Sequence, residues 1–246
     1  MKPSSPLQGA AYLLKGVRLL TLPGIRPFVL MPLLLSTLLF ALGTWYTLRL
    51  IQAWSAQIND LLPSWLQWTE WLVIPLFFLT VGAIGFWTFS MVANLLGSPF
   101  NALLAQKVEI QLAGRSPAGE SPLKAVGLLE NLLPPVQSEI NKIIYFIKWS
   151  IPLLLLFAIP VINIAAPLLW MVFTCWMTAF QYADIPMSNH EWNDKRILAK
   201  LREKRLLTLG FGAATLLMTC IPVINFLAMP AAVAGATALW VEEWRD

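Results

Sequence analysis

Four long runs without a charged residue constrain this chain more than any other feature of its sequence. They cover residues 27–48, 71–106, 149–183 and 206–241. At 1.5 Å of rise per residue, the 22 residues of the first run are enough for one helix to cross the hydrocarbon core of a bilayer. The other three have 35 or 36 residues each, which is too long for one straight crossing. The runs therefore predict an integral membrane protein built of helices.

The overall charge agrees with this interpretation. Charged residues make up 12% of the chain, against about 25% in a typical soluble domain. The net charge of +4 would fit a nucleic-acid-binding protein if the chain were soluble, but the basic residues flank the apolar runs. We therefore expect no nucleic-acid partner. Cys175 and Cys220 lie inside apolar runs and are interpreted as packing residues, not as a disulfide or a metal pair.

Turn-forming residues interrupt the three longer runs. In the second run, residues 94–101 are expected to end or sharply bend the helix. The third and fourth runs contain the same five residues, Ile-Pro-Val-Ile-Asn, at 159–163 and 221–225. Because proline lacks an amide donor and disfavours helix in the preceding residue, each of these runs is predicted to fold as a helical hairpin. Four short full crossings are the alternative.

The distribution of basic residues distinguishes two topologies. If the first two runs cross the membrane and the last two are hairpins, 16 of the 17 Lys and Arg residues lie on one side, and Arg49 is the exception. If each later run crossed once, the six basic residues at 195–205 would move to the other side. Positive charges concentrate on the cytoplasmic side of membrane proteins, which favours the hairpin model with both termini cytoplasmic.

The predicted fold is an all-α membrane protein that forms a single integral membrane domain over residues 1–246. It combines an N-terminal interfacial amphipathic helix, two long transmembrane helices and two partly penetrating helical hairpins broken by Pro and Asn. The expected segments are an interfacial helix at 6–22, spanning helices at 27–49 and 71–93, a cytoplasmic-side helical region at 107–148, and hairpins at 149–183 and 206–241. Pro134 and Pro135 are expected to break the helical region 123–148 in two.

Residues that carry catalysis or bind cofactors are scarce. The one histidine, His190, lies in a polar stretch that suggests a solvated side chain. The chain has no Gly-x-x-x-x-Gly-Lys sequence for nucleotide phosphates, and none of the four runs contains a carboxylate. We therefore expect no enzyme activity, no catalytic residue, no metal, no cofactor and no ATP hydrolysis by this chain.

The sharpest local feature is the turn before the first run, at residues 22–28. Pro27 suits the first turn of a helix, where its missing amide would have no partner. Gly24, Ile25 and Arg26 would then precede the helix with unpaired amides at the positive end of its dipole, and Arg26 adds a guanidinium that matches an oxyanion. This arrangement predicts an anion site. The alternative is a plain turn with Arg26 as a headgroup anchor.

The sequence resembles the CysZ family of bacterial sulfate permeases over nearly its whole length. The resemblance lies in the order and spacing of short motifs at residues 9–16, 22–28, 31–33, 96–101, 107–109, 181–186 and 189–190. It implies high-affinity sulfate uptake across the bacterial inner membrane for cysteine biosynthesis, by a multi-pass protein with two spanning helices and two hairpins. It also implies sulfite as a regulator, contact with membrane lipid, and a homo-oligomer built from dimers, with a hexamer as one arrangement.

The family's sulfate-binding Gly-Leu-Arg turn matches Gly24, Ile25 and Arg26, with isoleucine in place of leucine. Pro27 stands where the family often has a second arginine, which leaves one guanidinium. Lys107, Glu109 and Arg115 are weaker candidates for an anion route or gate, in which Glu109 pairs with one of the two cations. A non-transporting membrane assembly or scaffold protein is the competing interpretation, and a membrane enzyme is the third.

Overall fold

The structure is a computed structural model that describes residues 5–61, 70–114 and 128–245. These residues contain helices and turns and no strand, which confirms the all-α prediction. The helices are α1 (Pro6–Leu20), α2 (Arg26–Leu61), α3 (Glu70–Ala113), α4 (Leu128–Phe157), α5 (Ala166–Ser188), α6 (Asp194–Glu203), α7 (Arg205–Thr219) and α8 (Pro222–Leu239). A 3-10 turn at Ile162–Ile164 precedes α5, and a π-helical turn at Trp240–Trp244 follows α8.

The chain forms two compact units. One unit comprises Met1–Val29 and Asn101–Asp246, and the other comprises Leu30–Phe100. Helices α2 and α3 run from one unit into the other, because α2 begins at Arg26 and α3 ends at Ala113. Within the residues that the structure describes, three helical segments are long and apolar enough to cross a membrane, namely Arg26–Leu50, Ser138–Phe157 and Pro222–Trp244.

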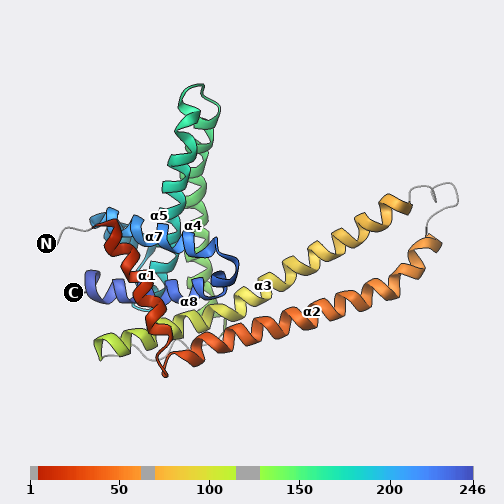
Figure 1. Cartoon of the computed structure of the whole chain (residues 1–246), viewed down its shortest axis with the longest axis horizontal. Helices are drawn as coiled ribbons and strands as arrows, with labels where there is room; N and C mark the ends of the chain where they lie inside the picture. The colour runs from red at the N-terminus through yellow and green to blue at the C-terminus, as the bar shows by residue number, and fades with distance from the viewer. Residues whose placement is uncertain (1–4, 62–69, 115–127, 246) are drawn as a thin grey trace. The chain divides into compact units, whose positions relative to one another are not determined.

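The unit Leu30–Phe100 is an antiparallel pair of helices formed by α2 and α3, which lie side by side (Figure 1). The ring of Phe89 packs directly on Gly43, where any side chain would overlap it. Many of the large apolar side chains of this pair are exposed, among them Leu34, Phe40 and Trp87. An outward apolar surface of this kind is typical of helices that face lipid.

Two breaks occur where the repeated Ile-Pro-Val-Ile-Asn sequence predicts them. Helix α4 ends at Phe157 and α5 begins at Ala166, while α7 ends at Thr219 and α8 begins at Pro222. Val161 has a positive φ of 72°, which is unusual for a β-branched residue and reverses the chain between α4 and α5. Helix α4 extends back to Leu128, so the first arm of that hairpin is much longer than its apolar run. The partial penetration of the two hairpins stays a prediction.

Two expected helix breaks are absent. Helix α3 continues through residues 94–101 with Pro99 inside it, and α4 continues through Pro134 and Pro135. A proline removes one hydrogen bond and costs about 3 kcal/mol in a helix interior. In α3 the expected break lies inside an apolar run, where ending the helix would leave several backbone groups unpaired at several kcal/mol each, so continuing that helix costs less.

Helix α1 packs closely on α7 and α8 in the larger unit (Figure 1). A β-carbon on Gly9 would overlap the carbonyl oxygen of Leu207, and one on Gly16 would overlap the carbonyl oxygen of Ala231. Seen from α8, Gly235 faces the backbone of α1 at Tyr12 and Leu13. These positions explain the small residues that cluster in α7 and α8, since only glycine permits backbone contact between helices at this distance.

We predict that Gly16→Ala destabilises the protein by about 2 kcal/mol, because the new methyl group overlaps the α8 backbone and helices must shift to admit it. Gly82→Ala is the matched control, since a β-carbon there meets nothing within 4 Å. Thermal melting in detergent is the measurement. A melting temperature that is several degrees lower for Gly16→Ala alone is expected, and equal melting temperatures for the two variants would refute the close packing.

Candidate functional site

The turn that joins α1 to α2 contains the predicted anion-binding residues. Thr21 caps the C-terminus of α1, and α2 begins five residues later at Arg26. Ile25 points inward and is only 2% exposed, whereas Gly24 and Arg26 are exposed. The buried isoleucine therefore anchors the turn in the core and holds its two neighbours at the surface.

The amides of this turn are less available than the sequence suggests. The N–H groups of Ile25 and Arg26 both donate to the carbonyl oxygen of Leu22, at 3.0 and 3.1 Å. The expectation of three unpaired amides is therefore wrong for these two residues. The chain enters α2 through a helix-like turn, and such a turn uses its amides internally. Gly24 is exposed, and its N–H donates no backbone hydrogen bond within the described turn.

The guanidinium of Arg26 is held over the same turn. Its Nε donates to the carbonyl oxygen of Thr21 at 2.7 Å. Among the described residues no carboxylate forms an ion pair with it. Because a guanidinium has five N–H donors in a planar fork, its two Nη groups still present a pair of donors to an anion.

The structure places a second cation near this turn. The ammonium of Lys107 lies 5.9 Å from the centroid of the Phe28 ring, and Phe28 stands two residues after Arg26. Lys107 is exposed and comes from the last turns of α3. The start of α2 and the end of α3 therefore carry positive charge in the same part of the larger unit. Arg115, the other predicted cation, lies outside the described residues.

Glu109 is buried, two residues after Lys107, and does not pair with that lysine. Its side chain is 1% exposed, and its two carboxylate oxygens each lie 3.0 Å from His190 Nε2. Arg245 Nη1 is 2.7 Å from Oε1 of the same carboxylate. Of the two cations expected to pair with Glu109, Lys107 does not, and Arg115 lies outside the described residues. Positions two apart point to different sides of a helix, so Lys107 faces outward and Glu109 inward.

His190 is not the solvated loop residue that its sequence neighbours suggest. Its side chain is 16% exposed, and its ring packs against Trp240 with centroids 5.4 Å apart. Trp192 meets the same indole edge-on at 4.7 Å, and the guanidinium of Arg196 lies 3.6 Å from the centroid of the Trp192 ring. The turn after α5 folds back against α3 and the end of α8, so a residue 81 positions away supplies the partner of His190.

The C-terminal turn Trp240–Trp244 also holds α1 and α7. Glu242 forms an ion pair with Lys15, and Glu243 pairs with Lys204. The hydroxyl of Tyr12 donates to Glu243 at 2.8 Å. Burial first, and then the negative charge of Glu243, raise the pKa of Tyr12 well above its usual value, so this hydroxyl stays protonated and donating. These contacts join the two ends of the chain.

A second buried ion pair connects α4 to α5. Lys142 Nζ lies 2.6 Å from Asp184 Oδ2 and 2.7 Å from Glu139 Oε1, and the hydroxyl of Ser188 donates to Asp184 at 2.7 Å. Sequence reasoning missed this pair and the contacts of Arg245. The available signal was position: Asp184 directly follows the third apolar run, and Arg245 follows the fourth after three residues.

The described residues contain no group of three or more His, Cys, Asp or Glu side chains placed to hold a metal ion. The arrangement therefore consists of an exposed cationic turn beside a buried, charge-balanced cluster. A cationic turn of this kind is suited to binding an anion.

Comparisons with known proteins agree with the resemblance stated from the motifs. The model of the family described as "Sulfate transporter CysZ/Etoposide-induced protein 2.4" matches residues 12–230. The sulfate transporter CysZ of Pseudomonas aeruginosa is 41% identical over 237 residues, which is 96% of this chain and 96% of that protein. The sulfate transporter CysZ of Salmonella typhimurium is 39% identical over 241 residues, covering 98% of this chain and 94% of that protein.

We predict that Glu109→Gln destabilises the protein by about 3 kcal/mol, because it leaves the Arg245 guanidinium without its negative partner and weakens the hydrogen bond to His190. Glu203→Gln is the control, since Glu203 is half exposed and its ion pair among the described residues is with Lys200 at the surface. Thermal melting in detergent distinguishes the two variants. If Glu109→Gln melted with the wild type, the buried cluster would not contribute to stability.

Proposed function

The chain belongs to the family described as "Sulfate transporter CysZ/Etoposide-induced protein 2.4", and on this premise we propose that it takes up sulfate across a membrane. The observation that carries this function is identity of about 40% over nearly the full length with proteins named sulfate transporter CysZ. Uptake of sulfate provides the sulfur for cysteine biosynthesis. The protein works as a multi-pass permease of the bacterial inner membrane, with both termini on the cytoplasmic side.

Transport here needs no chemistry by the chain itself. Moving a bare divalent anion into hydrocarbon costs on the order of tens of kcal/mol, so the protein must provide donors at the entrance and a polar route beyond it. The chain has no nucleotide-binding sequence of the Gly-x-x-x-x-Gly-Lys type. Sulfate therefore moves passively or with a gradient, and the protein is a permease without enzyme activity.

Sulfate binds first at Gly24, Ile25 and Arg26. The amide of Gly24 and the free Nη groups of Arg26 receive the anion, while buried Ile25 holds the turn in place. The amides of Ile25 and Arg26 join only if the turn releases the Leu22 carbonyl. Lys107 supplies a second positive charge close by, beside the ring of Phe28.

Glu109 positions the end of α3 and does not meet the anion directly. It is fully buried and held by His190 and Arg245, so it fixes the helix that presents Lys107 to the outside. Lys107 and Arg115 then begin the anion route.

The protein acts as a homo-oligomer built from dimers, with a hexamer as one arrangement. Sulfite is a similar oxyanion and regulates uptake at the turn of Gly24, Ile25 and Arg26. The exposed apolar side chains of α2 and α3 support membrane and subunit contacts.

We predict that Arg26→Gln lowers the initial rate of radiolabelled sulfate uptake into proteoliposomes about tenfold at subsaturating sulfate. It removes charge-assisted hydrogen bonds worth roughly 1.5–3 kcal/mol to the bound anion. Arg202→Gln is the matched control, because Arg202 is an exposed arginine of α6, far in sequence from the turn. Equal rates for Arg26→Gln and the wild type would remove Arg26 from the mechanism.

The same assay tests the proposed function itself. Two results together would favour the scaffold interpretation. Proteoliposomes with the wild-type protein would take up no more sulfate than empty vesicles, and a strain that lacks the gene would still grow on limiting sulfate. A permease instead requires that the deletion strain depend on cysteine or thiosulfate when sulfate is scarce.

A second variant tests the cation contributed by α3. Lys107→Gln is expected to raise the sulfate concentration for half-maximal uptake about fivefold while the maximal rate is kept, because an exposed charge attracts the anion without forming a fixed bond. Lys107→Arg should restore the wild-type value, and added salt should reduce the difference between variants. A changed maximal rate with unchanged half-saturation would assign Lys107 to a later step.

A further inference from the structure

One face of α1 is turned away from the bundle and is mainly apolar. Leu7, Ala11, Leu14 and Arg18 follow one another at intervals of four, three and four residues, so they share this face. Leu7 is 82% exposed and Leu14 is 61% exposed. The opposite face, with Gly9, Leu13, Gly16 and Leu20, is buried against α7 and α8. Exposed leucines with an arginine at one end are typical of a helix that lies in a membrane interface.

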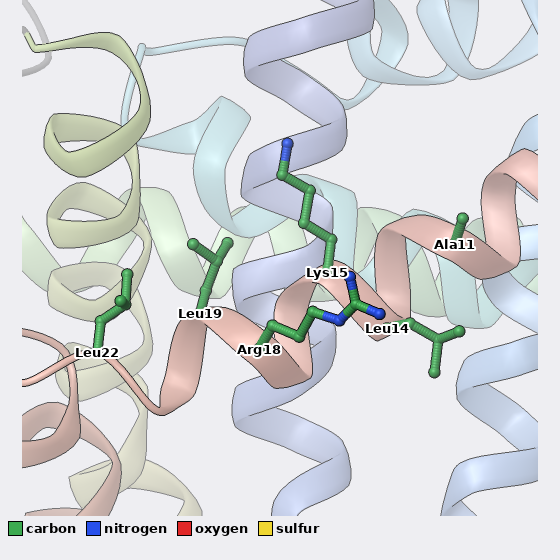
Figure 2. Close-up of a pocket in the computed structure, with 6 residues that line it drawn as sticks. All are labelled: Ala11, Leu14, Lys15, Arg18, Leu19 and Leu22. Atoms are coloured by element: carbon green, nitrogen blue, oxygen red, sulfur yellow. The ribbon is translucent and has the colours of Figure 1, made fainter.

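A groove of about 550 Å³ runs along this exposed face. Its lining consists of Ala11, Leu14, Lys15, Arg18, Leu19 and Leu22. Figure 2 shows the side chain of Arg18 lying back along α1, with its guanidinium on the side of Leu14 and Lys15. Four of the six lining residues are apolar, and the other two are the cationic Lys15 and Arg18. The groove therefore combines an apolar lining with two basic side chains.

The two cations that line the groove, Lys15 and Arg18, are not equivalent. Lys15 forms an ion pair with Glu242, so its charge is compensated within the protein. The guanidinium of Arg18 is exposed and forms no ion pair with any carboxylate in the described part of the chain. The groove consequently has one uncompensated positive charge beside an open apolar surface.

We propose that this groove binds an anionic phospholipid, with its phosphate on Arg18 and an acyl chain along Leu14 and Leu22. A small oxyanion would find one guanidinium only, because the amides of α1 are used within the helix. A lipid matches both the charge and the apolar lining. A second protein copy is a poorer fit, since a stable interface needs about 800 Å² on each partner and this groove is a few residues long.

Lipid bound here holds α1 at the membrane surface directly before the turn that begins at Thr21. The inference rests on the groove and its charges and does not depend on which anion the protein transports.

Lipid binding is tested on the full-length protein in detergent by native mass spectrometry, with phosphatidylglycerol and phosphatidylcholine titrated separately. The variants are Arg18→Gln and Leu14→Gln, and Arg202→Gln is the control for loss of an exposed arginine.

The wild type should bind phosphatidylglycerol more tightly than phosphatidylcholine. Arg18→Gln should weaken phosphatidylglycerol binding about fivefold, the value expected for one basic residue near an anionic headgroup, and leave phosphatidylcholine binding unchanged. Leu14→Gln should weaken the binding of both lipids, and Arg202→Gln the binding of neither. Because Arg18 and Leu14 are exposed, these variants should keep the elution volume of the wild type.

Three results would overturn the proposal. If Arg18→Gln and Arg202→Gln weakened phosphatidylglycerol binding equally, the lipid would be responding to the overall charge of the protein alone. Displacement of phosphatidylglycerol by an equal concentration of glycerol 3-phosphate would mean that Arg18 binds small oxyanions that carry no acyl chain. A smaller oligomer mass in Leu14→Gln, with lipid binding unchanged, would assign the face to a second copy of the chain.

Discussion

The buried carboxylate of Glu109 is the constraint on which much of the larger unit depends. A carboxylate removed from water costs several kcal/mol unless opposite charges and hydrogen bonds compensate it. His190 and Arg245 provide that compensation from the turn after α5 and from the C-terminal end. Three segments distant in sequence must therefore stay together. The C-terminal turn extends the network to α1 through Tyr12 and Lys15, so the first helix is tied to the last.

Backbone contact between helices provides the second part of the framework. Gly9 and Gly16 let α1 lie directly on α7 and α8, and no side chain fits between the helices at these points. Because α1 is fixed along its inner face, the turn after it starts from a defined place, and buried Ile25 fixes the other end of that turn. Packing of small residues thus decides where Arg26 stands and which way its guanidinium is free to point.

The few charges of this chain have separate roles. Those that face inward, such as Glu109 and the Lys142–Asp184 pair, are balanced and join helices. Arg26 and Arg18 face outward and form no ion pair with a carboxylate of the described ranges, and they lie at the two ends of the short connection between α1 and α2. A protein that binds anions at a membrane surface needs this division, because a compensated cation attracts neither sulfate nor a lipid phosphate.

The sequence by itself determined the helical class, the helix breaks at 159–163 and 221–225, and the family. Uncharged runs and prolines act on the local backbone, and the family motifs can be read from the order of residues alone. Only the tertiary structure decided that His190 meets Glu109, since burial and pairing depend on residues 81 positions apart. It also decided that two of the three amides in the predicted anion turn are already bonded to Leu22, and that α3 continues through Pro99. In both cases the backbone N–H and C=O groups find hydrogen-bond partners within the fold. Local sequence preferences do not show which of the possible partners each group takes.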